Sequence, residues 1–346
     1  MELYNKLSAK QRAILIEKAG GKRLTLSFYT YHEIKNIKLF RDHLYLKWNK
    51  LDVLGRIYIA NEGINAQLSL PSENFKSFKT SIDEIQFLSD VRLNIAIEHD
   101  NHSFLKLKIK LRNKIVADGL DTVNIDLKKS GKHLNAKQFN ELIESPETLL
   151  VDMRNHYESE IGHFKGAILP DVDSFRESLP IIDKNLQKHK DSKNIVMYCT
   201  GGIRCEKASA FLKYKGYKNV FQLEGGIIEY TRQANEKGIE NKFLGKNFVF
   251  DHRRSESISG EIISDCHQCG KKCDEHVNCA NAACHLLFIQ CDKCSNLLDN
   301  CCSKECQKTH SLPYEEQKKL RKGKQNSNKI FKKGRSKALK YKKIST

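Results

Sequence analysis

The chain has 346 residues, a hydrophobic content of 39%, a net charge of +18 and twelve cysteines. This length suffices for two or three domains with buried cores. No apolar run is long enough to cross a bilayer, and the N-terminus lacks the apolar core of a signal peptide. These features exclude a transmembrane protein, predict a cytoplasmic one without a membrane partner, and favour metal binding or redox chemistry over disulfides for the cysteines.

The positive charge is concentrated at the C-terminal end. Thirteen Lys or Arg and no acidic residue follow Gln317, which leaves a charge of only +5 on the rest of the chain. A segment of this composition cannot bury enough apolar surface to offset the entropy lost on ordering. The sequence therefore predicts a basic, disordered tail over residues 311–346, which is either a solvated appendage or a segment that binds RNA phosphates.

Residues 1–130 show strand and helix patterns in the order βαββαβ after an N-terminal helix. The expected elements are a helix within 1–22, a strand over 24–30, a helix over 32–51, strands over 56–60 and 64–70, a helix over 72–85 with Ser72 as N-cap, and a strand over 104–111. This order predicts a ferredoxin-like or acylphosphatase-like α+β domain.

The strand expected over 104–111 alternates strictly between apolar and basic residues. Its exposed face would carry Lys106, Lys108 and Lys110, with Arg112 directly after it. One interpretation is a surface that contacts RNA. The other is an edge strand that lysines keep soluble.

Residues 113–145 are expected to form a linker and a short helix, and residues 145–240 a second α/β domain. Strands are expected over 149–153, 167–169, 195–198 and 220–222, alternating with helices. This alternation predicts a mostly parallel sheet covered by helices on both faces. Ligands bind such sheets beyond the carboxyl ends of the strands, where Cys199 is placed.

The stretch from Asn194 to Cys205 predicts a buried strand that delivers Cys199 into a glycine-containing turn before a helix. The first N–H groups of a helix have no intrahelical partner and stabilise an anion. Gly201 and Gly202 let several N–H groups converge on one atom, and Arg204 adds a fixed positive charge. All of these effects favour a thiolate at Cys199.

Four segments in this order resemble the rhodanese superfamily. The strand-end Asp152-Met153-Arg154 and the segment Gly162–Ile168 come first, followed by the Cys199 loop and by Gly225-Gly226. Lys165, where a proline is usual, and Tyr230, where a tryptophan often follows, depart from the pattern outside the loop. The resemblance implies a rhodanese-like parallel α/β fold.

The flanking segments narrow the resemblance to the rhodanese-domain tRNA uridine hydroxylases, the TrhO family. The similar segments are Gly55–Gln67, Cys199–Lys207, Gly245–Asp251, Cys279–Asn281 and Cys284–Cys291. This resemblance covers residues from about 24 to 306. It implies an oxidoreductase that modifies tRNA by hydroxylating the wobble uridine to 5-hydroxyuridine, with molecular oxygen as co-substrate.

On this interpretation Cys199 acts as a nucleophile or carries a persulfide. Arg204 stabilises the anion together with the amides of the loop residues Thr200, Gly201, Gly202 and Ile203, and Cys205 is a candidate resolving thiol. Tyr58, Tyr198 and Tyr230 are candidates for stacking on the base, with core packing as the alternative. No dinucleotide or flavin fingerprint is present.

Two other reactions suit a loop of this type. A low-pKa thiolate can hold sulfane sulfur as a persulfide, so a rhodanese-type sulfurtransferase that carries it on Cys199 is the alternative function. Phosphatases related to this fold use a Cys-x5-Arg loop, whereas Cys199 and Arg204 form a Cys-x4-Arg loop. The shorter loop argues against phosphatase chemistry.

Residues 241–310 form a small cysteine-rich region with ten cysteines. Cys266 with Cys269 and Cys291 with Cys294 have the Cys-x2-Cys spacing that lets two thiolates grip one tetrahedral ion. The spacing predicts a structural zinc site, and Cys302 with Cys306 offers another pair. His285 and His310 are additional candidate ligands. Reduced buried cysteines and an iron–sulfur cluster are the alternatives.

Overall fold

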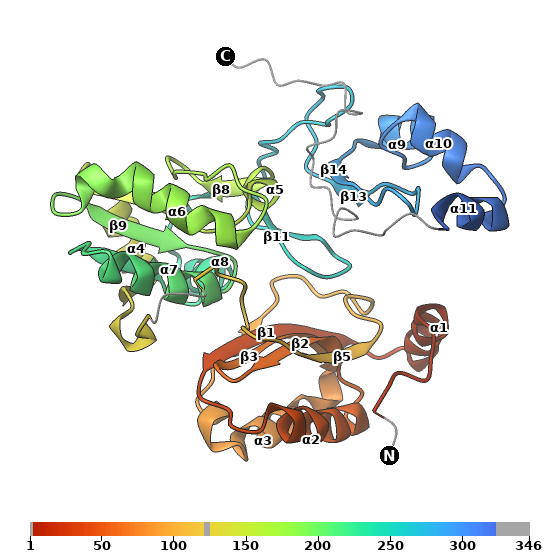
Figure 1. Cartoon of the computed structure of the whole chain (residues 1–346), viewed down its shortest axis with the longest axis horizontal. Helices are drawn as coiled ribbons and strands as arrows, with labels where there is room; N and C mark the ends of the chain where they lie inside the picture. The colour runs from red at the N-terminus through yellow and green to blue at the C-terminus, as the bar shows by residue number, and fades with distance from the viewer. Residues whose placement is uncertain (1–2, 121–124, 323–346) are drawn as a thin grey trace. The chain divides into compact units, whose positions relative to one another are not determined.

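The computed structural model describes residues 3–120 and 125–322 (Figure 1). Its contacts divide the chain into two units. The first comprises Met1–Arg154, Gly166–Asn241 and Val249–Glu256, and the second comprises Asn155–Lys165, Lys242–Phe248 and Ser257–Thr346. The domain boundaries expected near residues 130, 145, 240 and 310 stay predictions. None of the helices in the described part of the chain has the length and apolar character that a membrane crossing requires.

The first unit contains an N-terminal α+β sheet with the strand order β4-β1-β3-β2-β5. β1 pairs antiparallel with β3 and β4, β2 pairs antiparallel with β3, and β5 lies parallel to β2. The elements are α1 (Ala9–Ala19), β1 (Arg23–Tyr31), α2 (Ile37–Lys50), β2 (Leu54–Ala60), β3 (Gly63–Pro71), η1 (Ser72–Asn74), α3 (Phe75–Asp83), η2 (Gln86–Leu88), β4 (Asn94–Ile95) and β5 (Leu107–Leu111). The acylphosphatase-like prediction is confirmed.

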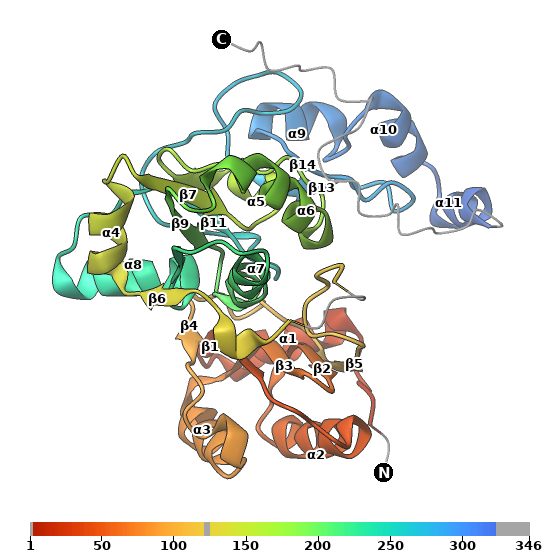
Figure 2. The same ribbon diagram turned by 60° about the vertical axis from the view of Figure 1, so that its left-hand side comes forward.

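The helices α2 and α3 cover one face of this sheet (Figure 2). Side chains that alternate along the strands, among them Phe28 and Leu68, pack there against Trp48 and Phe78 in one core. The opposite face carries polar and aromatic side chains such as Tyr29 and Tyr31. On this opposite face, Leu54 at the start of β2 packs with Ile16 of α1 and with Phe104 in a second, smaller cluster. We call the face opposite α2 and α3 the second face of the sheet.

Three details of the N-terminal expectations are wrong. The closing strand of the βαββαβ order is the short β4 beside β1, whereas β5 extends the opposite edge. α2 begins at Ile37 because Asn36 caps it and the backbone of His32 and Ile34 is bonded to the β2–β3 turn. Ser72 caps no helix, since its hydroxyl donates to the carbonyl of Lys22 over 3.0 Å.

The second sheet of the first unit is fully parallel, in the order β6-β10-β9-β7. Its elements are η3 (Leu127–Lys129), β6 (Lys132–Leu134), α4 (Ala136–Ile143), β7 (Thr148–Asp152), α6 (Phe175–Leu186), η4 (Gln187–His189), β9 (Asn194–Tyr198), α7 (Ile203–Tyr214), β10 (Val220–Leu223) and α8 (Gly226–Lys237). This arrangement confirms the rhodanese-like parallel α/β fold.

Helices cover both faces of the parallel sheet (Figure 2). Ile195 and Met197 of β9 pack with residues of α6 and α7 in one core, whereas α4 and α8 contact each other through Phe139 and Tyr230. Two strand expectations fail here. Residues 167–169 form only an isolated bridge between Ile168 and Val151, and the three-residue β6 lies in the segment expected to be linker and helix.

The second unit contains short elements. These are α5 (His156–Ser159), β8 (Gly162–Phe164), β11 (Phe243–Phe248), β13 (His276–Asn278), β14 (Leu287–Ile289), α9 (Asp292–Leu298), α10 (Lys304–His310) and α11 (Tyr314–Arg321), with β12 (Ser255–Ser257) at the border of the two units. β8 pairs antiparallel with β11, and β13 with β14. Disorder was expected from residue 311, but Tyr314–Arg321 is helical; residues 323–346 of the expected tail lie outside the described residues.

Candidate active site

Cys199 lies directly after β9, at the carboxyl end of a central strand of the parallel sheet. The loop from Cys199 to Gly202 leads into α7, which begins at Ile203. Gly202 has a φ of 99°, a left-handed conformation that favours glycine. This sharp turn brings the start of α7 back over the sulfur, and the Cys199 side chain is fully buried.

Hydrogen-bond donors surround the Cys199 sulfur. The backbone N–H of Gly202 donates to Sγ over 3.2 Å. Burial by itself would raise the pKa of Cys199, but the Cys205 thiol, the charge of Arg204 and the N–H groups of these two residues lower it to about 6. Cys199 is therefore mostly a thiolate at neutral pH, as the sequence predicted from the loop.

Cys205 and Arg204 have different roles around this anion. Burial and the neighbouring Cys199 raise the pKa of Cys205 well above its ordinary value, so Cys205 stays a thiol that donates to the thiolate. The Arg204 guanidinium is almost fully buried, contacts the Thr200 hydroxyl at 3.4 Å and lies 6.0 Å from the ring centroid of Phe250. A fixed cation and a protonated thiol thus both lie close to the thiolate.

The start of α8, at Gly225 and Gly226, supports the loop by hydrogen bonds and close backbone contact. The N–H of Ile227 donates to the Cys199 carbonyl over 3.0 Å, and that of Ile228 donates to the Thr200 carbonyl over 3.3 Å. A Cβ on Gly226 would lie 2.4 Å from the Cys199 carbonyl oxygen. These two hydrogen bonds and the close approach of Gly226 fix the loop against the start of α8.

The second face of the N-terminal sheet covers the loop. The Tyr31 hydroxyl donates to the Ile203 carbonyl over 3.2 Å, and the Asn94 amide donates to the Gly201 carbonyl over 3.4 Å. A Cβ on Gly202 would lie 2.8 Å from the Tyr29 hydroxyl. Burial, Glu206 and the nearby Cys199 all raise the pKa of Tyr29, which therefore remains a neutral hydrogen-bond donor.

Ion pairs fasten α7 to the N-terminal sheet and its linker. Lys207 lies 2.5 Å from a Glu62 carboxylate oxygen and 3.0 Å from one of Asp118. Glu206 accepts a hydrogen bond from Tyr29 over 3.2 Å and lies 2.8 Å from the His133 ring. Through Lys207 and Tyr29's partner Glu206, α7 is bonded to the N-terminal sheet, and through His133 it is bonded to β6 of the parallel sheet. The helix α7 therefore contacts both sheets.

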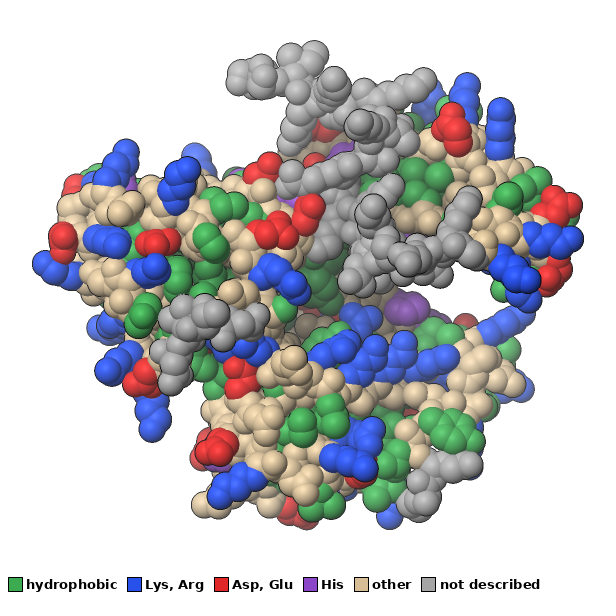
Figure 3. All heavy atoms as spheres, viewed as in Figure 1, with side chains coloured by type: hydrophobic (Ala, Val, Ile, Leu, Met, Phe, Trp, Pro, Cys, Tyr) green, Lys and Arg blue, Asp and Glu red, His purple; other side chains and the backbone are tan. Residues whose placement is uncertain are grey.

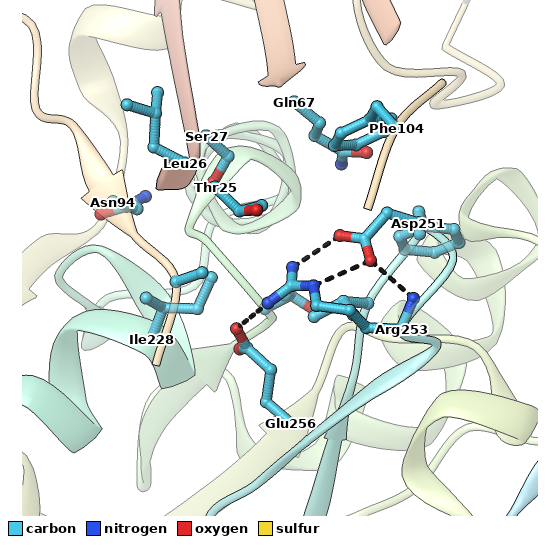
Figure 4. Close-up of a pocket in the computed structure, with 14 residues that line it drawn as sticks. Thr25, Leu26, Ser27, Gln67, Asn94, Phe104, Ile228, Asp251, Arg253 and Glu256 are labelled. Carbon is cyan, nitrogen blue, oxygen red and sulfur yellow. Dashed lines mark hydrogen bonds and ion pairs between the residues drawn. The ribbon is translucent and has the colours of Figure 1, made fainter. Parts of the chain in front are cut away.

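A pocket opens beside the loop (Figure 4). It is lined by the second face of the N-terminal sheet, by Thr200 and by residues of the segment 249–256. The amides of Gln67 and Asn94 lie on its walls together with Phe104. At its base the Arg253 guanidinium bonds to both carboxylate oxygens of Asp251, over 2.9 and 2.5 Å, and to Glu256. The pocket therefore combines a fixed charge network with uncharged amides and the aromatic rings of Phe104 and Phe250.

The expected basic residues lie on β5 and directly beside it. Lys108 and Lys110 are exposed on the second face of the sheet. The guanidinium carbon of Arg112 lies 5.4 Å from the ring centroid of Tyr58. Partial burial and the like charges of Lys110, Arg56 and Lys106 lower the pKa of Lys108. Figure 3 shows Lys and Arg side chains gathered over this part of the sheet. We call Arg56, Lys106, Lys108, Lys110 and Arg112 the basic strip.

Two sets of four cysteines in the second unit are close enough to hold a metal ion. The first is the expected set, Cys266, Cys269, Cys291 and Cys294, and the second is Cys279, Cys284, Cys302 and Cys306. His285 and His310 belong to neither set. The sequence suggested Cys302 and Cys306 as a pair, but it did not indicate their partners.

The other expectations have mixed outcomes. The Asp152–Arg154 pair forms a fully buried ion pair at 2.7 Å. Tyr198 and Tyr230 are fully buried in the core, so their stacking on a base is not supported. Tyr29, Tyr31 and Asn94 were missed, because no local pattern indicates contacts with a loop more than 100 residues away. Gln67 and Asp251 lie in segments that carried the family resemblance, which was the one available signal.

A buried thiolate at the end of a parallel strand, held by the first turn of a helix, defines a rhodanese-like site. Family models described as UPF0176 acylphosphatase like domain, Rhodanese-like domain and Rhodanase C-terminal match residues 23–115, 135–233 and 244–307. The rhodanese resemblance is thus confirmed.

Whole-chain relatives specify the family. The chain is 53% identical to the tRNA uridine(34) hydroxylase of Leptospira interrogans, over 96% of this chain and 90% of the relative. It is 50% identical to the proteins of that name from Photorhabdus laumondii and Yersinia pestis, over 96% of this chain and 95% and 94% of theirs. The chain belongs to the tRNA uridine(34) hydroxylase family.

The charge of Arg204 should set the pH range in which Cys199 is ionised. Because the lowered pKa lies at about 6, activity limited by the thiolate should fall as pH decreases through 6 and level off above it. Arg204→Gln removes the cation and should move this midpoint upward by about one pH unit. The measurement is kcat/KM against pH for both proteins. An unchanged midpoint would show that Arg204 does not stabilise the thiolate.

Gly226 should be required for loop geometry rather than for folding. Gly226→Ala places a Cβ against the Cys199 carbonyl and displaces the loop, which should lower kcat by about 10²-fold or more. The matched control is Gly238→Ala at the other end of α8, where φ is also positive but no atom lies within 4 Å. Turnover and thermal unfolding of both variants test this, and equal turnover would contradict the supporting role of Gly226.

Proposed function

We propose that this protein hydroxylates the wobble uridine, residue 34 of tRNA, at C5 to give 5-hydroxyuridine, with molecular oxygen as co-substrate. One observation carries the proposal: a thiolate with a pKa of about 6 lies beside a pocket, in a chain at least 50% identical over 96% of its length to tRNA uridine(34) hydroxylases. Cys199 is the proposed catalytic residue, with Arg204 and the loop amides of Thr200 to Ile203 as its stabilising groups.

The Cys199 thiolate can make C5 of the uracil ring nucleophilic. C5 of uracil is a weak nucleophile, but addition of the Cys199 sulfur to C6 gives C5 enolate character. O2 reduced by two electrons to the peroxide level is the oxygen electrophile: the enolate forms the C–O bond to one oxygen as the O–O bond breaks, and the other oxygen leaves as hydroxide, which becomes water. Loss of the C5 proton and of the thiolate restores the aromatic ring and regenerates Cys199. Arg204 favours the thiolate as both attacking and leaving group.

The overall reaction requires two electrons besides those of uridine. Uridine, O2, two electrons and two protons give 5-hydroxyuridine and water, so a two-electron donor of the thiol class, oxidised to a disulfide, balances the equation. Cys205 supplies a reduced thiol beside Cys199, held protonated by its raised pKa. It is the proposed resolving thiol should the Cys199 sulfur become oxidised.

The pocket beside Thr200 is the proposed binding site for the extruded base. Enzymes that modify a base take it out of its stack and bind its hydrogen-bonding edge, and a single-stranded anticodon loop makes this inexpensive. Gln67 and Asn94 offer amides able to pair with the uracil carbonyls and N3–H, and Phe104 offers a ring face. The segment 249–256 would close the pocket on the other side.

The basic strip is the proposed contact for the tRNA backbone. It lies on the second face of the sheet, which also carries Tyr29, and Tyr29 contacts the Cys199 loop. Clustered lysines bind phosphates and release counterions. One sheet face would therefore both cover the catalytic loop and hold the substrate, in the cytoplasm where tRNA resides.

We also propose that the expected cysteine set, Cys266, Cys269, Cys291 and Cys294, holds a structural zinc ion. Four thiolates are one of the usual ligand sets of closed, structural zinc sites. The site would stabilise the second unit and take no part in the chemistry at Cys199.

Cys199→Ala should abolish 5-hydroxyuridine formation and leave tRNA affinity nearly unchanged. Nucleosides from tRNA of a deletion strain, complemented with wild-type or variant protein, are measured by mass spectrometry. Cys205→Ala is the matched variant and should retain at least the first turnover with purified protein. Undiminished 5-hydroxyuridine with Cys199→Ala would exclude the thiolate mechanism. A thiolated nucleoside or rapid sulfur transfer from thiosulfate to cyanide would favour the sulfurtransferase alternative.

Replacing the strip lysines should weaken tRNA binding in a salt-dependent way. In a Lys106→Gln, Lys108→Gln, Lys110→Gln protein, the slope of log K against log salt concentration should become shallower by about 2, because three phosphate contacts are lost. The control, Lys213→Gln, Lys215→Gln, Lys218→Gln, makes the same charge change at exposed sites following α7 and at its end. Equal slopes in the two triple variants would show that the strip makes no special contact.

A further inference from the structure

The second unit brings eight of its ten cysteines together in two separate groups. In each group the four sulfur atoms lie within 4.8 Å of one another. The first set is the one assigned a structural zinc above. The second set, Cys279, Cys284, Cys302 and Cys306, has the same composition and no acidic or histidine member.

The sulfur separations match a tetrahedral metal site and not a disulfide. Cys269 and Cys291 lie 3.6 Å apart in the first set. In the second set, Cys302 lies 3.7 Å from both Cys284 and Cys306. A zinc ion with bonds of about 2.3 Å holds its sulfurs about 3.8 Å apart, whereas a disulfide joins them at about 2.05 Å. All eight sulfurs are free of disulfides.

The backbone around both sets is arranged to stabilise thiolates. The N–H of Cys291 points at the Cys266 sulfur over 3.4 Å, and in the second set the N–H of Cys302 points at the Cys279 sulfur over the same distance. Such outer hydrogen bonds fix the orientation of ligands and offset their negative charge. The two sets share this feature although their sequence spacings differ.

Each set combines one pair from a loop with one pair at a helix start. Cys266 and Cys269 precede Gly270, whose φ of 76° permits the tight turn. Their partners flank the start of α9, where Cys291 is the N-cap. In the second set Cys302 lies just before α10 and Cys306 lies within it. The equivalent construction indicates that the two sets serve the same purpose.

We propose that the second set binds a second zinc ion and that the two ions form a cross-brace. Along the chain the pairs alternate: 266 and 269, then 279 and 284, then 291 and 294, then 302 and 306. Each ion therefore joins two segments between which a pair of the other set lies. The inference extends the proposed first zinc site and is independent of the tRNA reaction.

The region between residues 264 and 310 has little else to hold it together. Its strands β13 and β14 have three residues each, and α9 and α10 have seven. One buried apolar cluster of the described region consists of Leu286 and Phe288 with Cys279, Cys301 and Cys302. Two-stranded sheets and cores of this size are marginal by themselves, and structural zinc supplies folding free energy directly.

Two cysteines of the same region provide internal controls. Cys273 and Cys301 are buried, yet neither belongs to a set. Replacing either one removes a thiol without removing a ligand. Cys269 is exposed and Cys306 half-exposed, so substitution at these two ligands removes little packing.

The experiment counts metal in the full-length protein, purified without chelator, by inductively coupled plasma mass spectrometry for zinc and iron. We expect two zinc ions per wild-type chain and two in Cys273→Ala and Cys301→Ala. Cys269→Ser and Cys306→Ser should each retain one, and the double variant should retain none. X-ray absorption of the wild type should give four sulfur neighbours per zinc at about 2.3 Å, a measurement that stands even if a variant does not fold.

The outcomes separate the two zinc proposals. One zinc in the wild type, lost in Cys269→Ser but kept in Cys306→Ser, would overturn the second site and leave the first. No zinc, or stoichiometric iron, would overturn both. If the cross-brace holds, limited proteolysis of either single variant should cut throughout residues 264–310, whereas cuts confined to the segments of one set would contradict it.

Discussion

The burial of one negatively charged sulfur constrains the rest of the first unit. A thiolate without water must receive its stabilisation from fixed dipoles and charges, here the N–H groups of the loop, the Cys205 thiol and Arg204. The carbonyls of Cys199 and Thr200 are bonded to the start of α8, which fixes the loop in place. That contact in turn requires glycine at position 226, since a Cβ there would meet three loop atoms within 2.7 Å.

The same constraint accounts for the polar and aromatic side chains on the second face of the N-terminal sheet near β1 and β4. The loop requires a cover that excludes water, and Tyr29, Tyr31 and Asn94 supply it from β1 and β4. Gly202 allows Tyr29 to approach, as Gly226 allows α8 to approach from below.

The sequence predicted what is encoded locally. β1, β2, β3, β9 and the Cys199 turn have clear periodicity or a particular glycine spacing, and they were found nearly to the residue. β4 and β6 have two and three residues, too few for a pattern, and their places are fixed by pairing with β1 and β10. The contact of Tyr29 with Glu206 joins residues 177 positions apart. Nothing in the neighbourhood of Tyr29 distinguishes it from an ordinary strand residue.

The cysteines show the same limit in a sharper form. A Cys-x2-Cys spacing identifies two thiolates that can share an ion, but it does not say which second pair completes the site. The first set joins two such pairs, so the expected grouping and the structure coincide. In the second set Cys279 and Cys284 are five positions apart and Cys302 and Cys306 four. Cys279 and Cys284 lie in the loop that joins β13 to β14, whereas Cys302 and Cys306 follow α9. The second grouping therefore follows from the tertiary structure that its own metal would stabilise.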